Sequence, residues 1–183
     1  MSFTPAQFRR RRGFTLVELV ASMTVIATLA AVSSGLIYSA TRAYRDISVR
    51  SRLHASASLA LTRIFTHLRA VPLTQATPTI IPSIDSVGAS TIAWAGDCSL
   101  SVSGTSLMLV VDGGAPYVLL GGVTAFSVST FDDSNSTLSA SLSGAACAAV
   151  RRVRISVTVE ASGISETVSS RVFLRSAMSG GGV

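Results

Sequence analysis

Residues 9–20 read Arg-Arg-Arg-Arg-Gly-Phe-Thr-Leu-Val-Glu-Leu-Val, four arginines followed directly by an apolar run that contains one carboxylate. From residue 14 to residue 38 the only charged side chain is Glu18. At ~1.5 Å of rise per residue, a helix over this stretch is long enough to cross a hydrocarbon core of ~30 Å. Because arginine and lysine favour the cytoplasmic flank, the N-terminus is predicted to be cytoplasmic and the chain after residue 38 extracytoplasmic.

Other interpretations of this stretch are weaker. A secretory signal peptide also has a basic start, and Ala31-Val32-Ser33 offers a small-residue cleavage site, but such signals usually have a shorter apolar run and no early glutamate. A plain single-span anchor remains an alternative. A nucleic-acid patch is disfavoured, because the four arginines lack interleaved aromatics and directly flank a membrane span.

Residues 13–18, Gly-Phe-Thr-Leu-Val-Glu after a short basic leader, resemble the N-terminus of type IV pilins and type II secretion pseudopilins. The resemblance implies that prepilin peptidase cuts between Gly13 and Phe14 and methylates the new amino group of Phe14. It also implies an assembly role for Glu18. A carboxylate inside a membrane costs roughly 2.5–3.5 kcal/mol on insertion scales, and in an assembled fibre the α-amino group of Phe14 on a neighbouring subunit would offset that cost.

Length and charge agree with one extracytoplasmic domain after the membrane segment. About 145 of the 183 residues follow residue 38, enough to bury a core. The formal net charge of +6 falls to +2 when residues 1–13 are removed, because four arginines and no acids leave with them. We therefore predict no nucleic-acid partner. The expected organisation is a leader (1–13), a membrane half of a helix (14–38), its amphipathic half (39–71), a connecting loop (72–90), a β-domain (91–178) and a flexible tail (179–183).

The helical pattern continues past the membrane segment. Leu53, Ala57, Leu61, Ile64 and Leu68 recur at spacings of three and four and lie on one helix face. Pro72 ends the pattern. The sequence predicts one helix from about residue 14 to residue 70, ~85 Å long, with its first half in lipid and its second half packed on a domain. This is the lollipop shape of the pilin family.

After residue 90 the pattern changes to alternation with a period of two, and residues 72–90 are expected to be a loop with at most a short strand. In residues 152–160, valine and isoleucine alternate with polar side chains, which predicts a half-buried strand. The predicted strands are 91–95, 99–103, 106–111, 117–120, 124–131, 152–160 and 166–175. Glycine pairs at 113–114 and 121–122 indicate hairpin turns, and residues 132–136 a polar loop. The fold class is therefore α+β, a long N-terminal helix packed on an antiparallel sheet.

A second, weaker resemblance covers residues 120–128, 151–159 and 167–175. A glycine-valine turn into a strand, a valine-rich strand with basic flanks and a last strand ending near an arginine are similar to J-type minor pseudopilins and W-type minor pilins. This similarity implies a subunit that starts a fibre or lies near its tip. Residues 136–149, rich in alanine, serine and glycine, resemble nothing specific.

Cys98 and Cys147 both lie on the predicted outer side, where a disulfide can form. Closing this loop of about 50 residues would stabilise the fold by roughly 4 kcal/mol on chain-entropy estimates. The alternative is two unpaired core cysteines. The two do not form a C-x-x-C pair, so neither a zinc site nor a redox site is indicated.

Catalytic chemistry is not indicated, and we expect no enzyme activity, no cofactor and no metal site. His54 and His67 are about 220° apart around the predicted helix and cannot converge. Asp132, Asp133 and Asn135 lack the later glutamate of a calcium loop and are interpreted as an exposed turn. Trp94 and Phe65 are expected in the core.

The sequence thus predicts a minor pilin-like structural subunit of a type II secretion pseudopilus. The expected partners are prepilin peptidase, other pilins or pseudopilins, the inner-membrane assembly platform and membrane lipid. The expected location is the cytoplasmic membrane, with a single span and a periplasmic domain. A minor pilin of a type IV or DNA-uptake pilus and a single-pass anchored binding domain are the alternatives.

Overall fold

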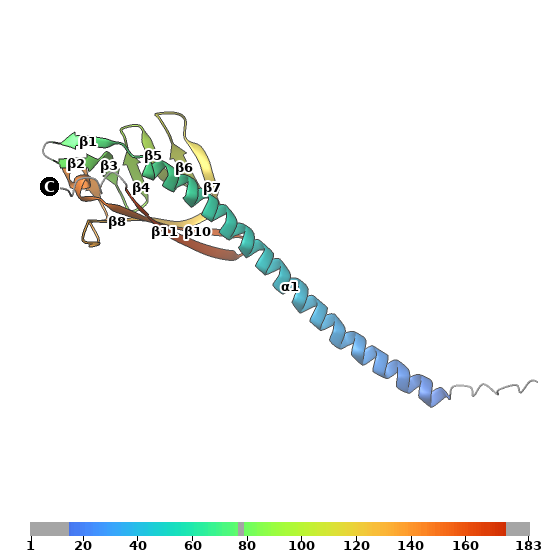
Figure 1. The fold of residues 1–183 in the computed structure, drawn as a ribbon. Helices are drawn as coiled ribbons and strands as arrows, with labels where there is room; N and C mark the ends of the chain where they lie inside the picture. The colour runs from blue at the N-terminus through green and yellow to red at the C-terminus, as the bar shows by residue number, and fades with distance from the viewer. Residues whose placement is uncertain (1–14, 77–78, 175–183) are drawn as a thin grey trace, which may run out of the picture. The chain divides into compact units, whose positions relative to one another are not determined.

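The computed structural model describes residues 15–76 and 79–174 (Figure 1). The predicted cleavage site at Gly13 and Phe14 and the predicted tail lie outside the described residues. The chain divides into two compact units, Met1–Arg45 and Asp46–Val183. Among the described residues, the first unit contains no element other than the helix. The second unit contains the end of the same helix and all the described strands.

Helix α1 runs from Leu16 to Arg69, as the apolar pattern predicts. Its first turn is capped by Thr15, whose Oγ1 accepts a hydrogen bond from the backbone N–H of Glu18 at 3.3 Å. The helix ends where Ala70 donates to the carbonyl of His67, two residues before Pro72. Proline cannot continue the hydrogen-bond ladder, so the chain leaves the helix at this point.

The last turns of α1 carry the helical part of the core. The buried residues lie on one face, as predicted: Ala57, Ala60, Leu61, Ile64, Phe65 and Leu68. They form one hydrophobic cluster with side chains from both larger sheets, and Trp94 belongs to the same cluster. Burial of this face is what holds the end of the helix against the strands (Figure 1).

Ile64→Ala is expected to lower the free energy of unfolding by about 2–5 kcal/mol, because the fully buried side chain leaves a cavity that its neighbours cannot fill. Urea unfolding of the protein in detergent micelles measures this change. Leu59→Ala is the matched control, since Leu59 lies on the same helix but is 72% exposed. The control should change stability by no more than about 0.5 kcal/mol.

The larger sheet has six strands in the order β7-β6-β5-β4-β3-β9, and all the neighbours pair antiparallel. Its strands are β3 (Ile84–Val87), β4 (Thr91–Trp94), β5 (Cys98–Ser103), β6 (Ser106–Val110), β7 (Tyr117–Gly121) and β9 (Leu142–Ser143). From β3 to β7 the order in space follows the order in sequence. This part is an antiparallel meander, which agrees with the predicted antiparallel sheet.

Residues 72–90 differ from the predicted connecting loop. They contain β1 (Leu73–Ala76), which pairs with β2 (Thr79–Pro82) as a separate two-stranded sheet, and then β3. Each of these strands has four residues. Strands this short show too little alternation to be seen in the sequence, and here the pairing partners make them strands.

A separate sheet has three strands in the order β11-β10-β8. These are β8 (Val123–Phe131), β10 (Arg152–Ala161) and β11 (Ile164–Phe173). On β10, Val153, Ile155, Val157 and Val159 are buried, while the residues between them face outward, as the alternation predicts. One face of this sheet therefore lines the core, and its other face carries polar and charged side chains.

The glycine pair at residues 121–122 was predicted to form a hairpin, and this prediction is wrong. It connects β7 of the six-stranded sheet to β8 of the three-stranded sheet, which are not paired. Gly122 has φ of +72°, and a Cβ at this position would lie 2.9 Å from the carbonyl oxygen of Glu160. The crossing needs glycine because of this close approach to β10. In contrast, Asp112 and Gly113, both with positive φ, lie in the connection between the paired strands β6 and β7.

The alanine- and serine-rich segment, residues 136–149, closes the far edge of the six-stranded sheet. It contains β9, which pairs with β3, and a 3₁₀ helix, η1 (Gly144–Ala149), which buries Cys147. The polar loop before it was predicted. Its ends meet through a hydrogen bond from Asp132 N–H to the carbonyl of Ser136.

Candidate assembly interface

The first unit presents an uncovered apolar helix. Every residue from 16 to 45 is exposed, including twelve large hydrophobic or aromatic side chains between Leu16 and Tyr38. By length and composition α1 could cross a membrane. Its most apolar segment of 18 residues has a mean hydropathy of 2.0, and none of these residues is buried. An apolar surface of this extent requires lipid or other subunits around it.

Most hydroxyl side chains within this stretch are satisfied by the helix itself. Six hydroxyl groups each donate to a carbonyl one turn earlier at 2.7–2.9 Å, from Ser22, Thr24, Thr28, Ser34, Ser39 and Thr41. A hydroxyl bonded in this way needs no partner from water. These residues therefore do not oppose burial in lipid or in a bundle of helices.

Glu18 is the exception. It is exposed in the first turn of α1, and it is the only acidic residue between positions 15 and 45. Its backbone N–H bonds to Thr15, but within residues 15–76 and 79–174 no cation lies within ion-pair distance of its carboxylate. The positive end of the helix favours a carboxylate at this position. A second source of positive charge would have to come from another molecule.

The sequence around this turn matches a known family. The family described as the prokaryotic N-terminal methylation motif matches residues 8–34. This motif supports assignment of the N-terminal segment to the type IV pilin and pseudopilin class. This motif implies processing by prepilin peptidase and assembly with other pilins, and it is typical of structural subunits, not of enzymes. No curated protein matches the chain significantly.

The motif and the apolar helix together fit a single-pass protein anchored in the inner membrane. Residues 8–34 contain all three positions for which the sequence predicts a role in maturation or assembly, Gly13, Phe14 and Glu18. Only Glu18 belongs to the described part of the chain. Its place in the first helical turn agrees with the role that the resemblance implies, but its function stays a prediction.

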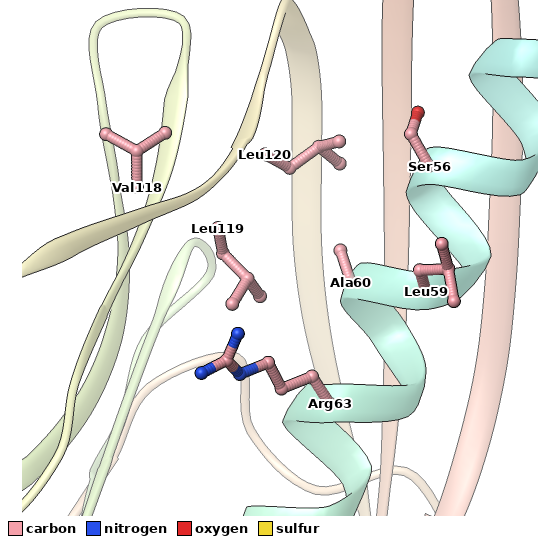
Figure 2. Close-up of a pocket in the computed structure, with 7 residues that line it drawn as sticks. All are labelled: Ser56, Leu59, Ala60, Arg63, Val118, Leu119 and Leu120. Carbon is pink, nitrogen blue, oxygen red and sulfur yellow. The ribbon is translucent and has the colours of Figure 1, made fainter.

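The second unit has a groove between α1 and β7 (Figure 2). The groove has a volume of about 290 Å³ and is lined by Ser56, Leu59, Ala60, Arg63, Val118, Leu119 and Leu120. Arg63 extends from the helix toward Leu119, and its guanidinium carbon lies 5.2 Å from the ring centroid of Tyr117. Because β7 is an edge strand of its sheet, Val118 remains 59% exposed. Sequence periodicity did not indicate this groove, since its two walls lie far apart along the chain.

A polar contact ties α1 to the three-stranded sheet. The carboxylate of Glu166 on β11 lies 3.2 Å from Nδ1 of His54 and 3.9 Å from Nε of Arg50. His54 therefore contacts a carboxylate on the sheet, a role that the sequence did not suggest. Within the described ranges no three His, Cys, Asp or Glu side chains gather as a metal site would require.

The predicted disulfide between Cys98 and Cys147 is not formed. Both cysteines are free and buried. Cys98 pairs with Trp94 of β4, whereas Sγ of Cys147 lies 3.7 Å from the carbonyl oxygen of Asp85 on β3, the next strand beyond β4. Adjacent strands are ~4.8 Å apart, so two strand spacings exceed the ~7 Å that a disulfide tolerates between Cα atoms. The sequence showed only that two cysteines lie on the same predicted side of the membrane, and it did not show that they are far apart in the fold.

Burial raises the pKa of the Cys147 thiol above its ordinary value of 9.0, and the nearby Asp85 carboxylate raises it further. The folded protein therefore keeps this thiol protonated more strongly than the unfolded chain does. The resulting stability is fully present below pH 9.0 and is lost as the pH rises through the folded-state pKa.

We expect the stability difference between the native protein and Cys147→Ala to shrink between pH 8 and pH 10, because the variant lacks this titration. Urea unfolding at both pH values measures it. Cys98→Ala serves as the control for loss of a buried thiol. A difference for Cys147→Ala that stays constant or grows with pH would contradict the assignment.

Proposed function

We propose that this chain is a minor pilin-like subunit of a type II secretion pseudopilus, placed at or near the tip of the fibre. The observation that supports it most is the methylation-motif N-terminus on a helix whose apolar half is uncovered and carries one carboxylate that forms no ion pair with any described residue. Such a helix is suited to storage in the membrane as a monomer and to transfer into a bundle of similar helices. In this proposal prepilin peptidase cuts after Gly13, and Glu18 pairs with the new amino group of a neighbour.

Support for a position near the tip comes from the second resemblance. The three segments similar to J-type and W-type minor subunits overlap β8, β10 and β11, which form one continuous sheet. A similarity that spreads over one structural unit carries more weight than scattered alternation of valine and threonine. In the described second unit the eight arginines equal the eight acidic residues in number, so the domain has no net field that would attract DNA. This balance favours a secretion fibre over a DNA-uptake pilus.

The test is deletion of the gene, followed in parallel by assays of protein secretion, surface piliation and DNA uptake. We expect secretion to fail while piliation and DNA uptake remain. Loss of piliation with secretion intact would instead support a type IV pilus. Mass spectrometry of the native N-terminus separates all fibre subunits from a simple anchor, since a fibre subunit begins with N-methylated Phe14 and an anchor retains Met1.

A further inference from the structure

The outward face of the three-stranded sheet carries a compact group of arginine and phenylalanine side chains. We define the arginine–phenylalanine patch as Arg152, Arg154, Arg171, Phe131 and Phe173. Across the ladder, Arg152 of β10 pairs with Phe131 of β8 and with Phe173 of β11, while Arg154 pairs with Arg171. The register therefore brings three cations from two strands to one end of the sheet.

The guanidinium groups lie on the phenyl rings. The guanidinium carbon of Arg171 is 4.3 Å from the ring centroid of Phe131, and that of Arg154 is 5.4 Å from the same centroid. Arg152 lies 4.9 Å from the ring of Phe173. At these distances the ring faces attract the cations and hold them in place. The patch is thus an ordered surface and not a set of free side chains.

Among residues 15–76 and 79–174 the cations have few acceptors. Nη1 of Arg152 and Nη1 of Arg171 both donate to Oδ1 of Asn135, at 2.9 Å each. Asn135 is a neutral amide, held by its loop at φ of +65°. Nε of Arg152 is buried from solvent and has no hydrogen-bond partner. One amide oxygen shared by two guanidinium groups leaves most of their donors available.

The nearest acids do not neutralise the patch. All nine acidic residues of the chain fall within the described residues, and the ion pairs found there involve Glu166 alone. Asp132 and Asp133, in the adjoining loop, accept hydrogen bonds from backbone N–H groups of Ser136 and Ser134 at 2.7 and 2.8 Å. Arg152 reaches only the backbone carbonyl of Asp133. Like charges held together without an ion-paired carboxylate favour binding of an anion.

We propose that the arginine–phenylalanine patch docks an acidic segment of another protein, with two or more carboxylates engaging Arg154 and Arg171. A guanidinium group binds a carboxylate through two parallel hydrogen bonds, and the exposed ring of Phe173 supplies apolar contact beside it, while the buried ring of Phe131 supports the arginines from below. A nucleic acid fits less well, because polyanion binding needs many cations along a track and the described second unit has no excess of positive charge. That the partner is another fibre subunit rests on the proposed function, whereas binding of the acidic segment does not.

The direct test measures binding of fluorescein-labelled hexaglutamate to the full chain in zwitterionic detergent, by fluorescence anisotropy at low salt. The patch variant is Arg154→Gln with Arg171→Gln, which keeps much of the aliphatic stem and removes two charges. We expect its affinity to be about tenfold weaker, because two exposed charge pairs are lost. The control variant is Arg52→Gln with Arg69→Gln, which removes the same charge from exposed positions on α1 and should bind as the native chain does.

Equal affinity of the native chain and the patch variant would overturn the proposal. Tighter binding of a twelve-nucleotide oligothymidylate than of hexaglutamate would overturn it in favour of a nucleic-acid surface. Thermal unfolding of each variant shows whether it has folded. If the double variant does not fold, the single variant Arg154→Gln provides a milder change, since Arg154 is the most exposed of the three arginines. If peptide binding depends on the patch but deletion of the gene leaves secretion intact, the proposed function is wrong and the proposal for the patch still holds.

Discussion

Gly13→Leu is expected to leave full-length precursor in the membrane, with cleavage slowed by roughly a hundredfold. The peptidase must approach the backbone before the cut closely, and a leucine side chain would occupy that space and displace the scissile bond. The measurement is the ratio of precursor to mature protein in membranes, followed by immunoblot after a pulse of synthesis.

The matched control is Gly35→Leu. It introduces the same side chain within α1, at a position where no atom lies within 4 Å of an added Cβ. Its cleavage should match that of the native protein. Normal maturation of Gly13→Leu would show that the peptidase does not recognise this glycine, and the proposed cleavage site would then be wrong.

Glu18→Val is expected to be cleaved and inserted normally but to lose assembly. The N–H that Thr15 caps belongs to the backbone of Glu18, so the helix start survives the substitution. The uncompensated carboxylate costs roughly 2.5–3.5 kcal/mol in the membrane, and its removal makes the monomer more stable there. In the fibre the same change leaves the neighbouring amino group without its partner, a loss of about 2–5 kcal/mol for a buried charge pair.

Co-purification of partner subunits with an affinity-tagged chain measures this loss. The amount of partner recovered should fall by at least about tenfold for Glu18→Val, since 1.4 kcal/mol already changes an equilibrium constant tenfold. Glu18→Asp keeps the charge and should retain part of the assembly. Unchanged recovery with Glu18→Val would mean that the carboxylate serves the helix N-terminus alone.

Much of this fold follows from local patterns in the sequence. The boundaries of α1, the buried stripe from Ala57 to Leu68 and seven of the strands were predicted, because each depends on residues close together along the chain. The maturation motif is also local and was recognised from residues 13–18. Strands β1, β2, β3 and β9 were missed, since two to four residues rich in serine, threonine and proline show no clear period.

Other features were decided by the tertiary structure. Residue spacing could not show that a strand separates Cys98 from Cys147, or that Gly122 crosses between sheets instead of turning a hairpin. The groove beside β7, the contact of His54 with Glu166 and the clustering of Arg152, Arg154 and Arg171 join residues that are distant in sequence or on different strands.

The sequence by itself determined where the helix lies, which of its faces is apolar and which class of N-terminus it carries, because these depend on period and composition over a few turns. Only the tertiary structure decided which cysteines, arginines and acids become neighbours. Those contacts depend on strand order and register, which stay open until the core packs.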